Sequence, residues 1–458
     1  MKWRMEPEAA SKLADGLAAA VVAAIPWSTS IAYILMAAWA VVSLANGDPM
    51  AWRAVMKRPA AYLPVAIAAL AAVGMLWAFG VPWAQRLEGL VSFGKLLAIP
   101  ILFVQFRNSP RTHWVLFAFL ISCTVLLALS WSQVVTGLSP LPRGGSTSYG
   151  VPVRDYIVQS QEFILCAVGL IYAAYTTIRR ARWPLALGCT ALALLFLANV
   201  FFIAPSRTGL VTFPVLLIVL VAANIRLKHA LGIVCGILAT CAVVWFASPA
   251  IQKRILGIVT EVQDARSKNV STSAGERLDY WTSSIAIVET APLIGHGTGS
   301  IRVMFERAAA GLGSGKRPTT NPHNQTLMVA IQFGIIGAAL LFAMWFAHFI
   351  LFRVGGLAGW IGMAVVAQNF IGSLFNNHLT DFTQSWIYMF GVGVTGALAL
   401  RAGAPQDRDD LGSNRPSIVT AVNSDNLVHL NAVREPLRTS DQVQGGHFRH
   451  PASGEAAT

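Results

Sequence analysis

The sequence predicts an all-α polytopic membrane protein with about twelve transmembrane helices and one large helical loop on the outer side. Only 12% of its 458 residues are charged and 55% are hydrophobic, whereas a soluble domain carries about 25% charged residues. Apolar runs of nearly 20 residues, the length that crosses a bilayer, recur until about residue 400. Most of the chain is therefore expected inside a membrane.

Nine spans are expected within residues 1–247 and three more within residues 323–401. The first two are short and are separated at Pro26. Isolated Gly and Pro inside the other runs are compatible with membrane helices. The twelve expected spans are Leu13–Ile25, Ser28–Ala45, Ala60–Phe79, Leu87–Phe106, Thr112–Thr136, Ile157–Ile178, Trp183–Ile203, Gly209–Ile225, Ala230–Ala247, His323–Phe352, Gly355–Leu374 and Thr383–Leu400.

The basic residues predict which side of the membrane each connection faces. They gather in alternate connections, such as Arg53 to Arg58 and Arg179 to Arg182, and such connections face the cytoplasm. An even number of spans then places both termini in the cytoplasm. If Leu13–Ala45 were a single span, the sidedness would invert and violate this charge bias.

Two long segments lie outside the expected spans. Residues 248–322 form the outer, periplasmic loop, and residues 402–458 are polar and aperiodic, as in a disordered cytoplasmic tail. The loop holds two stretches with helical apolar spacing, which suits helices lying on the membrane or on the bundle. Their apolar residues are Ile251, Ile255, Ile258 and Val262 in the first and Leu278, Trp281, Ile285 and Val288 in the second.

The net charge of +13 does not indicate nucleic-acid binding, because the basic residues lie in the short clusters that membrane topology requires. All five cysteines lie inside apolar runs, so we expect small buried hydrophobic side chains rather than disulfides or metal ligands. They are Cys123, Cys166, Cys189, Cys235 and Cys241.

The first candidate site is Pro205-Ser206-Arg207-Thr208-Gly209, between two expected spans on the outer side. Ser206 or Thr208 can cap the following helix. An arginine at a helix N-terminus is unfavourable by about 0.3–1 kcal/mol unless an anion is bound there. Arg207 therefore indicates a phosphate or pyrophosphate site, or alternatively an arginine that reaches the lipid headgroups.

The second candidate is His323, at the start of the tenth expected span. Asn321 is expected as the N-cap and Pro322 as the first helical residue. The helix dipole should then lower the pKa of His323 from about 6.5, and nearby arginines should lower it further. A neutral imidazole can act as a general base, and the alternative is a histidine that only forms a hydrogen bond at the interface.

Two further groups complete the candidates. A helix through Gly275-Glu276-Arg277 would place Arg277, Tyr280 and Ser284 on one face, with Arg277 as a second anion ligand or as a solvated partner of nearby acids. In the outer turn at 376–381, Asp381 either caps the last span or orients a sugar hydroxyl or a basic residue. His378 is a weaker candidate than His323.

Nucleotide and metal sites are not indicated. The phosphate-loop spacing fails around Lys316, because Ala310 replaces the first glycine and Arg317 follows the lysine. Gly295 to Gly299 reads as a turn. The outer segments gather too few carboxylates and histidines for a metal, so no cofactor is expected.

Together these residues resemble the O-antigen ligase and polymerase superfamily of bacterial inner membranes. The resemblance spans about residues 155–400. It rests on the order, spacing and shared sidedness of Ser206-Arg207-Thr208-Gly209, Arg277 with Trp281, Pro292-Leu293-Ile294-Gly295-His296-Gly297-Thr298-Gly299, and Pro322-His323-Asn324 followed by Leu327, Gly334 and Gly337.

The resemblance implies a GT-C-like glycosyltransferase that moves a glycan from undecaprenyl pyrophosphate at the periplasmic face, without metal or ATP. The ligase branch, whose acceptor is the lipid A core, is favoured by the turn at 374–381. Arg207 and Arg277 would bind the pyrophosphate and His323 would act as the base. The substrate-binding residues would be Ser206, Thr208, Tyr280, Asn321, Asn324 and Asp381.

Three alternatives remain at this point. A polymerase or a protein O-oligosaccharyltransferase of the same superfamily would use the same chemistry on another acceptor. A transporter would carry ionisable residues at the middle of its spans, whereas Glu88, Lys95 and Glu162 lie nearer the span ends. A purely structural membrane protein would leave Arg207 and His323 at helix starts unexplained.

Overall fold

The computed structural model describes residues 6–138, 149–247, 249–268, 272–311, 319 and 321–402, and every regular element within these ranges is helical. The helices are α1 (Pro7–Ala24), α2 (Thr29–Ala45), α3 (Pro49–Met56), α4 (Pro59–Gly74), α5 (Trp83–Gly94), η1 (Lys95–Leu97), α6 (Ala98–Phe106), α7 (Thr112–Thr136), α8 (Tyr156–Arg179), α9 (Trp183–Ala198), η2 (Asn199–Ile203), α10 (Arg207–Asn224), α11 (Leu227–Ala247), α12 (Pro249–Ser267), α13 (Ser273–Thr290), α14 (Ile301–Gly311), α15 (Gln325–Leu351), η3 (Phe352–Val354), α16 (Gly356–Gly372) and α17 (Phe382–Ala402).

Each of the twelve ranges predicted as spans is mostly helical, which confirms the all-helical fold class. Within the described ranges, six helices are long and apolar enough to cross a membrane, or seven if α2 and α3, bent by 104° at their junction, count as one span. The number twelve therefore stays a prediction, as does the assignment of residues to domains. The predicted tail falls at 403–458, outside the described residues, apart from its first residue.

Some helix boundaries differ from the predicted ones, and two helices were not predicted. α1 begins at Pro7 rather than Leu13, so its third turn carries the buried Asp15. The helices α3 and α14 were not predicted. The prediction of buried cysteines is confirmed for Cys123 and Cys166, whereas Cys235 is exposed. The side chain of Cys241 lies outside the described residues.

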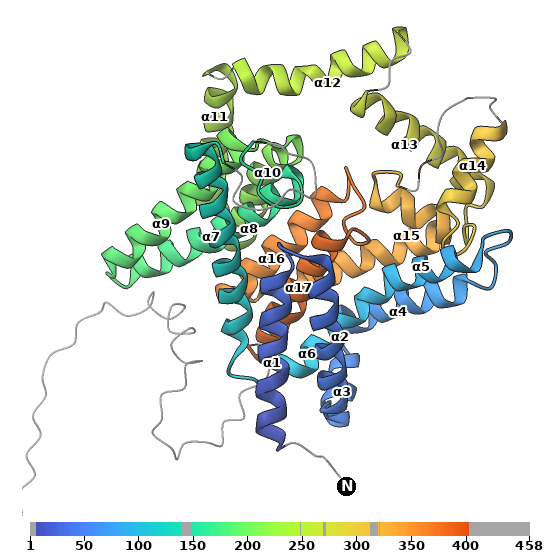
Figure 1. Cartoon of the computed structure of the whole chain (residues 1–458). Helices are drawn as coiled ribbons and strands as arrows, with labels where there is room; N and C mark the ends of the chain where they lie inside the picture. Colours follow the sequence, from blue (N-terminus) through green and yellow to red (C-terminus); the bar gives the residue numbers. More distant parts are fainter. Residues whose placement is uncertain are drawn as a thin grey trace, which may run out of the picture. The chain divides into compact units, whose positions relative to one another are not determined.

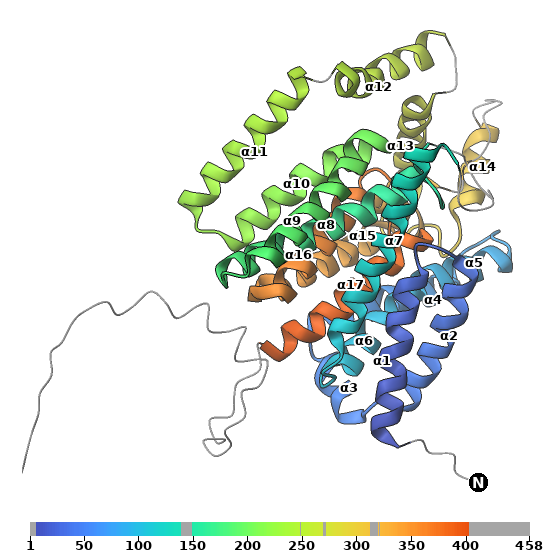
Figure 2. The ribbon, with the colours of Figure 1, turned by 60° about the vertical axis from the view of Figure 1, so that its left-hand side comes forward.

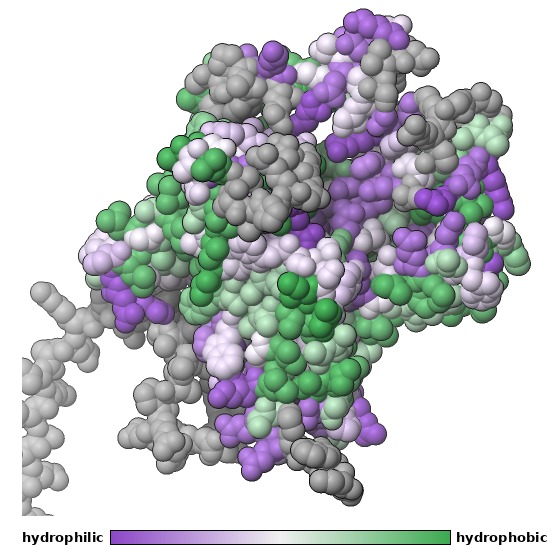
Figure 3. All heavy atoms as spheres, viewed as in Figure 1, coloured by the Kyte–Doolittle hydropathy of each residue, from purple (hydrophilic) through white to green (hydrophobic). Residues whose placement is uncertain are grey.

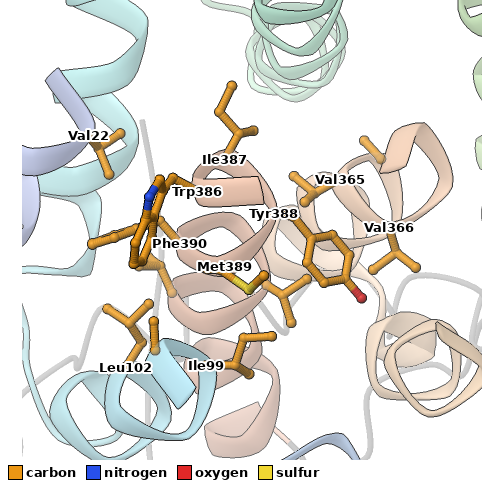
Figure 4. Close-up of a cluster of buried hydrophobic side chains, with 14 of the residues drawn as sticks. Val22, Ile99, Leu102, Val365, Val366, Trp386, Ile387, Tyr388, Met389 and Phe390 are labelled. Carbon is orange, nitrogen blue, oxygen red and sulfur yellow. The ribbon is translucent and has the colours of Figure 1, made fainter. Parts of the chain in front are cut away.

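The core of the bundle surrounds the last helix, α17. Figure 4 shows side chains of α17 between Val22 of α1, Ile99 and Leu102 of α6 and Val365 of α16. Small residues allow this packing, because a Cβ added at Gly393 would lie 2.5 Å from the Leu102 Cβ. The start of α17 is thus fixed by close packing, which positions the outer turn before it.

A second group of helices lies next to the segment between α11 and α15. α8 packs against α9, α10 and α16, and α15 packs against α4 and α16. In Figures 1 and 2, α8, α9, α10 and α16 lie side by side, and α12 and α13 lie beyond the starts of α10 and α15. The two amphipathic stretches predicted in the loop are therefore confirmed as the helices α12 and α13.

The predicted inner face of α13 is only partly correct. Ile285, expected on its apolar face, is 51% exposed, whereas Ser284 and Ile287 are buried. Ile287 packs in a small cluster with Phe305 of α14 and Ile331 of α15. The side of α13 that faces the body thus includes Ser284, which was predicted to share a face with Arg277 and Tyr280.

The glycine-rich turn at 295–299 joins the loop to the bundle. The backbone N–H groups of His296, Gly297 and Thr298 donate to Ile331 O, Gln332 O and Gly74 O at 2.9, 2.9 and 3.1 Å. Gly295, Gly297 and Gly299 all have positive φ, and a Cβ on any of them would lie within 2.6 Å of backbone atoms of α15, α4 or α5. The prediction of a turn is therefore confirmed, and its glycines are needed for close approach.

Candidate functional site

Arg207 is the first residue of α10, and Ser206 is its N-cap. The Gly209 N–H donates to Ser206 Oγ at 2.9 Å, and Ser206 Oγ lies 2.6 Å from Ser160 Oγ of α8. Of the two predicted caps, Ser206 is correct, whereas Thr208 is the second residue of the helix and half-buried. The hydroxyl pair fixes the start of α10 and with it the origin of the Arg207 side chain.

The Arg207 guanidinium already binds an anionic group, the carboxylate of Glu261 in α12. Arg207 Nη1 donates to Glu261 Oε2 at 3.1 Å, and Nη2 donates to Oε1. The backbone N–H of Ala274, in the first turn of α13, also donates to Glu261 Oε2 at 3.3 Å. The hydrogen bond from Arg207 lowers the pKa of Glu261 below its ordinary value. Arg207 and the α13 N-terminus therefore form an anion site that holds a carboxylate of the chain itself.

Arg277, in the second turn of α13, belongs to the same group of charges. Burial and Arg207 lower its pKa, whereas Tyr156 at the start of α8 and Glu261 raise it. Arginine remains charged despite such shifts. The structure thus brings Arg207 and Arg277 together, with two positive charges around one carboxylate.

His323 lies two residues before α15, contrary to the prediction that it would occupy the first turn. Asn324, not Asn321, is the N-cap, and its Oδ1 accepts the Leu327 N–H at 3.1 Å. His323 has a φ of +53°, a left-handed conformation that costs a non-glycine residue about 1–3 kcal/mol. Asn321 helps to hold it, because Asn321 Oδ1 accepts the His323 N–H at 2.8 Å.

The pKa of His323 is lowered from 6.5, as predicted, and a nearby arginine contributes, as expected. Burial contributes most and Arg277 comes next, while the hydrogen bond with Asn376 and the charge of Glu276 oppose them. His323 lies outside the helix, and the effects that lower its pKa are burial and Arg277 rather than a place in the first helical turn. The link between Arg277 and His323 places all three main candidates in one region.

Aromatic side chains of α13 hold the His323 segment. The Tyr280 ring stacks on the imidazole with centroids 6.1 Å apart and an interplanar angle of 17°. The Trp281 indole N–H donates to the His323 carbonyl at 3.3 Å. α13 therefore supplies both the second arginine and the surface on which the histidine lies.

The outer turn before α17 supplies the hydrogen-bond partner of the imidazole. His323 Nδ1 lies 3.1 Å from Asn376 Oδ1, and Asn376 Nδ2 donates to Asp381 Oδ2 at 2.9 Å. Burial raises the pKa of Asp381 to about 6, although the nearby Lys95 lowers it. Asp381 is thus at the site, and it contacts an asparagine rather than a basic side chain.

The remaining candidates are placed as follows. The Asn324 amide donates to Leu374 O at 3.2 Å, and the Asn321 amide donates to Asn376 Oδ1 at 3.3 Å. His378 is buried, and burial lowers its pKa to about 4. Figure 3 shows hydrophilic residues gathered in the region between α13 and α17 of Figure 1.

Three residues at this site were not predicted as functional. Glu261 lies within the first predicted amphipathic stretch but was not singled out, and Asn376 was named only as part of the turn at 376–381. Lys95 lies in an apolar span and donates to Thr380 O at 2.8 Å. Among the residues that the structure describes, His, Cys, Asp and Glu side chains do not gather in groups of three that suit a metal. Chemistry without a metal stays a prediction.

A comparison with known families gives a match over the middle of the chain. Residues 191–342 match the family model described as O-antigen ligase, a range that includes Arg207, Arg277 and His323. No curated protein matches the chain. This match, over about a third of the chain, supports the resemblance to the O-antigen ligase superfamily.

Proposed function

We propose that this chain is an O-antigen ligase of the bacterial inner membrane, with both termini in the cytoplasm and its site facing the periplasm. It moves a glycan from undecaprenyl pyrophosphate to a sugar hydroxyl of the lipid A core, without ATP or metal. The superfamily implies activity of the ligase or polymerase type. The proposal adds the donor, the acceptor and the orientation in the membrane.

The observation that carries the proposal is a half-buried histidine near Arg277, which together with Arg207 surrounds the Glu261 carboxylate. A general base must be neutral at the working pH, and burial together with Arg277 lowers the pKa of His323. The bond of Nδ1 to Asn376 leaves Nε2 to accept a proton. A donor pyrophosphate and an acceptor hydroxyl need these two kinds of group side by side.

The reaction is a direct displacement at the anomeric carbon of the donor. His323 Nε2 takes the proton of the acceptor hydroxyl as its oxygen attacks, and the bond from the anomeric carbon to the pyrophosphate oxygen breaks. The new glycosidic bond has the inverted configuration, and undecaprenyl pyrophosphate leaves with the electron pair. Arg207 and Arg277 stabilise the charge that develops on this leaving group.

Glu261 occupies the place where the pyrophosphate binds in this mechanism. The donor therefore exchanges with the carboxylate, because guanidinium binds phosphate in the same bidentate way. The pair is suited to exchange, since the side chains of Arg207 and Glu261 are 31% and 29% exposed. Exposed ion pairs stabilise a protein by only about 0–1 kcal/mol.

An assay with purified protein tests the proposal. It contains the undecaprenyl-pyrophosphate-linked glycan and lipid A core, with chelator present and ATP absent. The unaltered protein is expected to ligate the glycan to the core. An equal amount of His323→Ala is expected to show no ligation. Full activity of His323→Ala would contradict the base assignment. Lengthening of the lipid-linked glycan in place of ligation would identify a polymerase instead.

A further inference from the structure

We propose that Asn376 is a positioning residue that fixes the tautomer of His323, and that Asp381 acts on the histidine only through Asn376. This inference rests on the proposed role of His323 as the base. It concerns a side chain that does not touch the reacting atoms, and it gives the carboxylate of Asp381 a function other than substrate binding.

The direction of the hydrogen bonds carries the inference. An ionised carboxylate only accepts hydrogen bonds, so Asp381 Oδ2, at 2.9 Å, takes the donor side of the Asn376 amide. The amide oxygen then faces His323 Nδ1 at 3.1 Å and the Asn321 amide N–H at 3.3 Å. An amide oxygen only accepts, so Nδ1 carries the proton. Nε2 is left with the lone pair that a base requires.

The turn that carries Asn376 and Asp381 is held on several sides. The Asp381 N–H and Thr380 N–H donate to Asn377 O at 2.9 and 3.0 Å. Gln325 Oε1, in the first turn of α15, accepts the Leu379 N–H at 2.9 Å, and Lys95 Nζ donates to Thr380 O at 2.8 Å. The amide of Asn376 is thus presented to the imidazole by a turn that both α15 and η1 fix.

The surrounding charges favour this arrangement at neutral pH. Asp381 faces Lys95 and Asp155, which act on its pKa in opposite directions, and burial raises the pKa to about 6. His323 faces Arg277 and Glu276 of α13. At pH 7 Asp381 is therefore largely ionised and His323 neutral, so the carboxylate, the amide and the imidazole are in the states that the chain of hydrogen bonds requires.

Exchanging the amide of Asn376 with the carboxylate of Asp381 tests the inference. Asn376→Asp alone places two carboxylates in contact, and transfer should fall by roughly 10- to 100-fold, the usual cost of losing a group that orients a histidine. In Asn376→Asp with Asp381→Asn, the new amide donates to the new carboxylate, which still accepts from Nδ1. This double variant should recover most of the lost kcat.

The pH profile separates positioning from packing. A carboxylate directly against the imidazole raises the pKa of His323. The fall of kcat at acidic pH, here called the acid limb, should therefore move up by about one pH unit in the double variant. Asn377→Asp adds the same charge one residue along, without a bond to His323, and should leave the limb in place. A residue that only packs would give no such movement.

Two results would overturn the inference. One is an acid limb of the double variant that coincides with that of the unaltered protein. The other is a double variant no faster than Asn376→Asp, although it is folded and binds the lipid-linked donor. His323→Ala separates these failures from that of the proposed function, because its full activity would remove the base itself.

Discussion

Two arginine–carboxylate pairs of this protein have the same chemistry and very different surroundings. Arg111 Nε donates to Asp15 Oδ2 at 3.1 Å, and the Asp15 side chain is 0% exposed. Ser109 Oγ and Gln105 Nε2 also donate to this carboxylate, at 2.6 and 3.0 Å. Arg207 and Glu261, in contrast, are about 30% exposed, and apart from Arg207 the side-chain carboxylate accepts the Ala274 N–H.

The difference distinguishes a structural pair from an exchangeable one. A buried carboxylate that loses its partners cannot be solvated, so breaking such a pair costs several kcal/mol. A half-exposed pair can open because water replaces the lost contacts. The Asp15 pair therefore joins α1 to the start of α7 permanently, whereas the Glu261 pair can give up its arginine to a ligand.

The largest expected effect is on stability. Asp15→Ala leaves Arg111, Ser109 and Gln105 without their acceptor, and the free energy of unfolding should fall by about 3–5 kcal/mol. Glu261→Ala should lower it by less than about 1 kcal/mol. Thermal unfolding of both variants in the same detergent measures the contrast, and equal losses would show that the two pairs are alike.

The next effect concerns transfer rather than stability. Arg207→Lys keeps the charge and loses the bidentate contact, so kcat should fall by roughly 100-fold, as when one donor to a developing charge is removed. The unfolding temperature should be unchanged. A conservative Arg111→Lys serves as the matched control, and it should lower the unfolding temperature while the folded fraction keeps its kcat.

A smaller effect is expected from the competing carboxylate. Glu261→Gln keeps the shape of the side chain and weakens its hold on Arg207, so the donor meets less competition. The gain of about 0.5–1 kcal/mol corresponds to a KM for the donor roughly 2- to 5-fold lower. An unchanged or higher KM would mean that Glu261 does not occupy the donor site.

The smallest effect is a shift of pH dependence. Arg277 lowers the pKa of His323, so Arg277→Gln raises that pKa and more of the base is protonated at a given pH. The acid limb of transfer should therefore move to higher pH, by less than about one unit. Arg302→Gln, on an exposed part of α14, should leave the limb unmoved and serves as the control.

The sequence was sufficient for features that depend on local pattern. Apolar runs located the helices, and the helix-start residues Ser206 and Arg207 were assigned correctly because a capping serine acts within one turn. Positive charges in alternate connections placed Arg207, Arg277 and His323 on one side, and the structure brings these three together. Their chemical roles remain predictions.

Features that depend on contacts across the chain were missed. The bonds from Arg207 to Glu261 and from His323 to Asn376 join residues 54 and 53 positions apart, and no local pattern marks such partners. The rule that Asn-Pro begins a helix failed at Asn321, because hydrogen bonds to Asn321 and Asn376 hold His323 in a left-handed conformation outside α15. Tertiary contacts outweighed local preference there.

The glycine turn at 295–299 has a consequence for how this loop can vary in sequence. It attaches the middle of the loop to the backbone of α15, α4 and α5. The segment between α13 and α14 therefore tolerates neither insertions nor larger residues at Gly295, Gly297 and Gly299. This restriction does not apply to substitutions in α12. The sequence of α12 can therefore vary while Tyr280, Trp281 and His323 keep their places.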